Sequence, residues 1–87
     1  MNWLDRLLAD EPRLVKREID ADCGCPEEEW DAYGLSLTMH LAAGRPSTAH
    51  ADAGDEGEWE TTVTANTIDD ARTAIFAWAR SIWENRA

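Results

Sequence analysis

The chain has 87 residues, with 18 acidic and 8 basic side chains, a formal net charge of −10 and 44% hydrophobic residues. This length and composition predict one small acidic domain over residues 1–87 and leave no room for a second domain. The acidity argues against direct binding of nucleic acid, because that affinity depends on Lys and Arg neutralising phosphates. A basic protein partner is favoured instead.

The apolar runs of the sequence are short. None approaches the ~20 residues that a membrane-spanning helix needs. The first residues, Met-Asn-Trp-Leu-Asp, reach an acidic side chain too early for a secretory signal. We therefore expect a soluble, cytoplasmic protein that does not enter a membrane.

Charge is unevenly distributed along the chain. Between Arg17 and Arg72 there is one basic residue, Arg45, against fourteen acidic ones, so this segment carries a net charge of −13. The remainder of the chain carries +3. Segregated charge of this kind indicates either an interaction surface or a solvated acidic face.

The N-terminal third has mixed signals. Apolar side chains recur three and four apart in residues 2–10, which predicts a short amphipathic helix. Pro12 either interrupts this helix or begins a second helical turn that extends towards Ile19, and an extended conformation of residues 15–21 is the alternative. Residues 22–31 combine Gly, Pro and a run of acids, which is typical of a loop.

Alternation of apolar and polar residues predicts a sheet. Every second residue from Tyr33 to Leu41 is apolar, which is the period of a strand with one buried face, and we expect this strand to be central. A second alternating strand covers residues 59–65. Weaker alternation over residues 49–53 predicts a strand at an edge of the sheet.

A C-terminal helix is predicted from residue 67 onward. Thr67 and Asp70 have the spacing of a capping box, and the apolar residues that follow form a stripe able to cover the sheet. The predicted class is therefore α+β in two layers: an N-terminal helix, two or three antiparallel strands, and a C-terminal helix packed on one sheet face. This element order is similar to that of double-stranded-RNA-binding domains and of some antitoxin folds.

Four residues are candidate metal ligands: Cys23, Cys25, His40 and His50. The two cysteines flank one Gly, which is too close for a relaxed disulfide, so thiols are expected. With the two histidines they would complete a zinc tetrahedron, but the spacing matches no usual zinc motif. No metal or other cofactor is predicted, and the acids of residues 20–31 and 52–58 are interpreted as solvated loops.

Motifs that would indicate an enzyme are missing from the sequence. It has no Gly-x-Ser-x-Gly, no phosphate-binding Gly-rich loop and no dinucleotide fingerprint. His40 and His50 lack an identifiable nucleophile and are interpreted as pH-sensitive surface groups. The sequence therefore favours a non-enzymatic protein.

Two of the five tryptophans, Trp30 and Trp59, are embedded in acidic segments. An aromatic anchor with a negative rim suits a basic protein surface, whereas the alternative is that both rings close the core. The predicted partner contacts are Glu27, Glu28, Glu29, Trp30, Asp31, Asp55, Glu56, Glu58, Trp59 and Glu60.

These patterns lead to a functional hypothesis. The acidic face would occupy the nucleic-acid-binding surface of a basic partner, as a nucleic-acid mimic or inhibitor. In size and charge the chain resembles small phage-encoded inhibitors of host defence, anti-CRISPR proteins among them. We expect a monomer or a homodimer. Two alternatives stay open: a halophile's acidic surface, since one Lys stands against seven Arg, and an antitoxin or assembly subunit.

Overall fold

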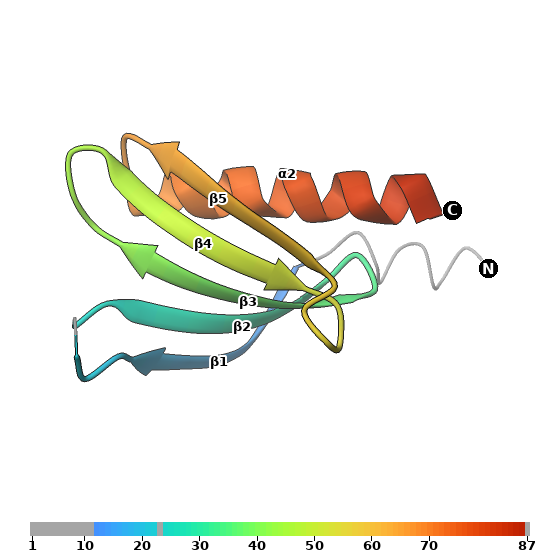
Figure 1. Cartoon of the computed structure of the whole chain (residues 1–87), viewed down its shortest axis with the longest axis horizontal. Coiled ribbons are helices and arrows are strands. Elements are labelled where there is room, and N and C mark those ends of the chain that lie inside the picture. Colours follow the sequence, from blue (N-terminus) through green and yellow to red (C-terminus); the bar gives the residue numbers. More distant parts are fainter. Residues whose placement is uncertain (1–11, 23, 87) are drawn as a thin grey trace.

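The computed structural model describes residues 12–22 and 24–86, which form a five-stranded antiparallel sheet and one helix (Figure 1). The elements are β1 (Arg13–Ile19), β2 (Pro26–Ala32), β3 (Leu35–Ala42), β4 (Ser47–Ala53), β5 (Trp59–Ala65) and α2 (Ile68–Arg86). The strands lie in chain order, and α2 packs along one face of the sheet. The predicted α+β class with a C-terminal helix on one face is confirmed, but the sheet has five strands rather than two or three. The helix predicted over residues 2–10 lies outside the described residues.

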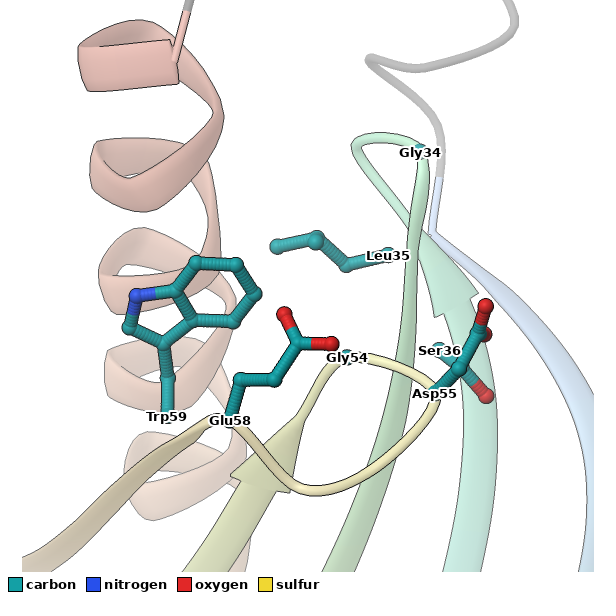
Figure 2. A pocket seen from close by; sticks show the side chains of 7 residues that line it. All are labelled: Gly34, Leu35, Ser36, Gly54, Asp55, Glu58 and Trp59. Atoms are coloured by element: carbon teal, nitrogen blue, oxygen red, sulfur yellow. The ribbon is translucent and has the colours of Figure 1, made fainter.

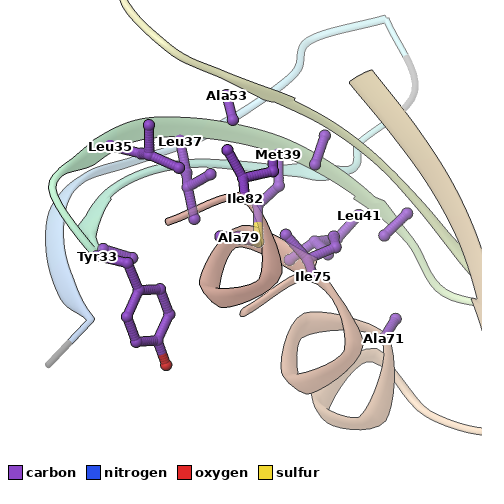
Figure 3. Packing of buried hydrophobic residues seen from close by; sticks show 13 residues of the cluster. Tyr33, Leu35, Leu37, Met39, Leu41, Ala53, Ala71, Ile75, Ala79 and Ile82 are labelled. Atoms are coloured by element: carbon purple, nitrogen blue, oxygen red, sulfur yellow. The ribbon is translucent and has the colours of Figure 1, made fainter. Parts of the chain in front are cut away.

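The hydrophobic core lies between α2 and the middle of the sheet (Figure 3). β3 supplies four large side chains that are at most 4% exposed, and it is the central strand, as predicted. The buried positions of β4 are Ser47 and three alanines, and such small side chains let a helix backbone approach closely. The buried hydrophobic residues of these three elements are Leu35, Leu37, Met39 and Leu41 of β3, Ala49, Ala51 and Ala53 of β4, and Ala71, Ile75, Ala79 and Ile82 of α2.

The start of α2 agrees with the predicted cap. The Oγ1 atom of Thr67 accepts a hydrogen bond of 3.1 Å from the backbone N–H of Asp70, which satisfies one of the unpaired donors of the first turn. Asp69 and Asp70 also place negative charge at the positive end of the helix dipole. Among the described residues, no helix is both long enough and apolar enough to cross a membrane.

The loop predicted over residues 22–31 is wrong from Pro26 onward, where β2 begins. The side chains of β2 alternate between the two faces of the sheet, but the run of acids obscures this in the sequence. Glu28 points to the same side as Pro26 and Trp30, towards α2. An acidic residue at an inward position made the strand read as polar throughout. The remaining acids of β2 point to the opposite side of the sheet.

The alternation predicts that a strand begins at Tyr33, but the structure places Tyr33 in a turn. Tyr33 and Gly34 both have positive φ, 54° and 71°, and form the two-residue turn between β2 and β3. Positive φ at both central residues is the requirement of a type I′ hairpin, whose twist matches that of the flanking strands. β3 therefore begins at Leu35.

Two further predictions need correction. The helical turn predicted after Pro12 is wrong, since β1 is extended, as in the alternative interpretation; a register shift between Leu14 and Lys16 interrupts its period of two. The strand predicted around residues 49–53 exists as β4, but it lies between β3 and β5 rather than at an edge. Its alanines gave a weak hydrophobic signal although every one of them is buried.

Candidate functional site

The sheet face opposite α2 is not packed against any other element of the described chain (Figure 1). We call it the open face. Strand alternation and register place alternate polar side chains on it. Its residues are Lys16 and Glu18 of β1, Glu27, Glu29 and Asp31 of β2, Ser36, Thr38 and His40 of β3, Thr48, His50 and Asp52 of β4, and Glu60, Thr62 and Thr64 of β5.

The open face brings parts of both acidic segments together. Cross-strand pairing forms one row in the order Lys16, Glu29, Thr38, Asp52 and Glu60. A neighbouring row runs through Glu18, Glu27, His40, His50 and Thr62. Carboxylates therefore lie towards both sides of the face, and hydroxyl and imidazole side chains lie between them.

Some charge on the open face is balanced within the chain. Lys16 Nζ lies 2.9 Å from Glu18 Oε1, and this hydrogen bond together with the glutamate charge raises the pKa of Lys16. Arg13 lies 3.3 Å from Asp31 at the strand end. Both pairs are exposed, so they contribute little to stability. Within residues 12–22 and 24–86, Glu27, Glu29 and Glu60 form no salt bridge with Lys or Arg.

Glu28 lies on the other side of the sheet and is only 1% exposed. Arg72 donates two hydrogen bonds to its carboxylate, Nε to Oε1 and Nη2 to Oε2, both of 2.9 Å. Trp30 Nε1 donates to Oε1 at 2.9 Å and Arg17 Nε donates to Oε2 at 3.0 Å. Burial alone would raise the pKa of Glu28, but these hydrogen bonds outweigh burial and lower it. Glu28 therefore joins β1, β2 and α2, and it is not available to a partner.

The two tryptophans of the acidic segments also lie against the core. The ring of Trp30 makes an edge-to-face contact with Phe76, with centroids 4.9 Å apart and planes at 74°. Trp59 borders a pocket of about 120 Å³ at one end of the sheet, where the β4–β5 loop approaches the β2–β3 turn (Figure 2). The pocket is lined by Gly34, Leu35, Ser36, Gly54, Asp55, Glu58 and Trp59.

The candidate metal ligands do not form the predicted cysteine–histidine set. Cys23 lies outside the described residues, and Cys25 belongs to neither group of ligand-type side chains found in the described chain. His40 and His50 lie directly opposite each other on β3 and β4, but each belongs to a separate group. One group is Asp20, Glu27 and His40, and the other is His50, Asp52 and Glu60; within each, the ligand atoms lie within 4.8 Å of one another.

Asp52 was interpreted from the sequence as part of a solvated acidic loop, but it lies on β4. Its carboxylate lies beside His50, with 3.5 Å between His50 Nε2 and Asp52 Oδ1. The other ring nitrogen, Nδ1, lies 3.0 Å from Thr62 Oγ1. A signal was present, since residues two apart on a strand point to the same face. The opposing Glu60 follows only from the register of β4 and β5.

Comparison of the chain with protein-family models, with curated proteins and with solved structures gave no match.

Proposed function

We propose that the protein acts by binding rather than catalysis, and that its open face docks on the basic, nucleic-acid-binding surface of a partner protein. The observation that supports this most strongly is the common orientation of acids from two distant segments, Glu27, Glu29 and Asp31 on β2 and Asp52 and Glu60 on β4 and β5. Carboxylates on this face would stand where phosphates otherwise bind. The sheet holds them in a fixed arrangement before the partner arrives.

The electrostatics of the face suit such a partner. Glu29 and Glu60 are exposed, and Lys and Arg of a partner could pair with them without breaking an ion pair of the described chain. Concentrated charge of one sign accelerates association with an oppositely charged surface. Between the acids, Ser36 and Thr38 offer hydroxyl groups that form hydrogen bonds without adding negative charge.

The proposed contact set is narrower than the ten residues that the sequence indicated. Glu28 and Trp30 are engaged inside the fold, and Trp59 lies beside the core. Exposed acids of the β4–β5 loop extend the surface at one end of the sheet. The contact set is Glu27, Glu29, Asp31, Asp52, Asp55, Glu56, Glu58 and Glu60.

A competition experiment tests this proposal. The protein is titrated into complexes of labelled DNA or RNA with basic nucleic-acid-binding proteins from its host or phage context, at low and high salt. The test variant carries Glu27→Gln, Glu29→Gln and Asp31→Asn. The control carries Asp69→Asn, Asp70→Asn and Glu84→Gln, which remove the same charge from exposed positions of α2.

We expect the wild type to displace nucleic acid in a salt-sensitive manner. The β2 variant should bind at least about tenfold more weakly, chiefly through slower association, and the α2 control should stay within about threefold. Equal losses in both variants would mean that bulk charge alone matters. Failure to displace any nucleic acid, or folding only in molar salt, would overturn the proposal in favour of a solvation role for the acids.

A further inference from the structure

Three ligand-type side chains converge at the β4–β5 side of the open face. Asp52 pairs directly with Glu60 in the β4–β5 register, and His50 lies two residues before Asp52 on the same strand. Their nitrogen and oxygen ligand atoms lie within 4.8 Å of one another. Imidazole with two carboxylates is a donor set that suits a divalent transition metal rather than Mg²⁺ or Ca²⁺, which favour oxygen ligands alone.

The pairing of Asp52 with Glu60 is unfavourable by itself. Like charges directly opposite each other on neighbouring strands destabilise a sheet. In the described part of the chain, neither carboxylate forms a salt bridge with Lys or Arg; the nearby group that can carry a positive charge is His50. The fold therefore places two negative charges together, and the described residues supply no permanent cation that pairs with them.

One oxygen of Asp52 has an incomplete environment. The Oδ1 atom is buried, although the side chain as a whole is 41% exposed, and this atom has no hydrogen-bond partner among residues 12–22 and 24–86. It lies 3.5 Å from His50 Nε2, without the alignment of a hydrogen bond. A buried carboxylate oxygen without a partner costs free energy, so this oxygen is suited to a positively charged ligand.

Thr62 holds one nitrogen of the His50 ring. With a proton on Nδ1, His50 donates its hydrogen bond to Thr62 Oγ1 at 3.0 Å, and the lone pair of Nε2 then faces Asp52 Oδ1. In this tautomer two acceptors face each other, and a cation between them would satisfy both. Ligating histidines commonly have their second nitrogen held by a neighbouring group in this way.

The separation of the two acceptors fits a tetrahedral ion. Zinc binds imidazole nitrogen and carboxylate oxygen at about 2.1 Å. His50 Nε2 and Asp52 Oδ1 are 3.5 Å apart, so the N–Zn–O angle at an ion bound to both atoms would be about 110°, close to the tetrahedral value. We propose that His50, Asp52 and Glu60 form a zinc site, with the fourth position open to water or to a side chain of a partner. The site shares Asp52 and Glu60 with the proposed docking surface, but its test is separate, because zinc binding is measured on the isolated protein without a partner.

The experiment measures Zn²⁺ binding to the full chain by competition with a chromophoric chelator. The binding is repeated with Cys23→Ser and Cys25→Ser together, so that thiols do not supply ligands. The test variants are His50→Gln and Asp52→Asn. The matched control is His40→Gln, which alters the imidazole directly across the β3–β4 pair but not a proposed ligand.

We expect one ion per chain, retained in the cysteine-free protein and bound at least about tenfold more weakly by both test variants. His40→Gln should change the affinity by less than about twofold. Zn²⁺ should also raise the melting temperature of the wild type and leave that of Asp52→Asn unchanged, which separates lost binding from lost folding. The site is overturned if binding survives both test variants, disappears with the cysteines or with His40, or does not saturate at micromolar zinc.

Discussion

Glu28 and Asp52 are carboxylates on opposite faces of one sheet, and their surroundings differ. Glu28 is enclosed on the α2 side and accepts hydrogen bonds from two arginines and an indole. Asp52 lies on the open face opposite another acid, and one of its oxygens accepts no hydrogen bond from the part of the chain that the structure describes. The comparison shows that the carboxylates on the two faces of the sheet have different surroundings. The buried charge of Glu28 is balanced by arginines inside the fold, whereas Asp52 and Glu60 form no salt bridge with Lys or Arg of the described residues.

The largest expected effect is that of Glu28→Gln. The substitution keeps the shape of the side chain but removes the buried anionic partner of Arg72, whose guanidinium is 18% exposed and keeps only the exposed carboxylate of Asp69. Removing one partner of a buried ion pair costs about 3 kcal/mol, and urea unfolding would measure the loss. Glu29→Gln is the control, because the neighbouring side chain is exposed, and it should change stability by less than about 0.5 kcal/mol. Similar losses in the two variants would contradict the assigned role of Glu28.

Stability should also depend on pH through Glu28. Its pKa is lower in the folded state than the ordinary value of 4.5, so the unfolded chain takes up a proton first as the pH falls. The stabilisation by this carboxylate is therefore fully present above about pH 4.5 and is lost as the pH falls through the folded-state pKa. Urea midpoints of the wild type and of Glu28→Gln should converge over that range. A constant difference down to acid unfolding would show that the ion pair is not its source.

A smaller effect is expected from Trp30→Phe. This change removes the neutral donor to Glu28 Oε1 and retains an aromatic ring against Phe76. Loss of one hydrogen bond to a charged acceptor should cost about 1.5 kcal/mol in thermal or urea unfolding. Trp83→Phe removes the same ring volume from another half-buried position next to the core and serves as the control. An equal cost in both variants would assign the loss to packing alone.

The side chains that point towards α2 determine how much of the fold could be predicted from the sequence. The central strand β3 and the helix α2 have apolar side chains at nearly all inward positions, so their periodicity was clear. β1 and β2 place Arg17 and Glu28 inward, and both strands were missed or left ambiguous. The inward Glu28 is explained by Arg72, which is 44 residues away in the chain. The local pattern of apolar residues cannot predict an ion pair between residues so far apart in the chain.

The candidate sites had a similar limit. Once β2 is known to be a strand, alternation alone assigns Glu27 and Glu29 to one face and Glu28 to the other. Alternation alone does not predict the group around Asp52, because the contact of Asp52 with Glu60 depends on the register of the β4–β5 hairpin. Register is set by the length and conformation of the connecting loop together with the buried face. Alternation placed the alanines of β4 on one face, but the sequence suggested neither the loop geometry nor the position of β4 between two other strands.

The smallest expected change in stability is that of a substitution on the open face, and it is a gain rather than a loss. Glu60→Gln removes one charge from the pair with Asp52, so without added metal it should stabilise the protein by about 0.5 kcal/mol. Urea unfolding at low salt would measure this gain, and added NaCl should reduce it because the side chain is exposed. Thr64→Val is the control, since it alters another exposed outward position of β5 without changing charge. A loss of stability in Glu60→Gln would show that the two carboxylates are already balanced within the chain, and the contrast with Glu28 would then fail.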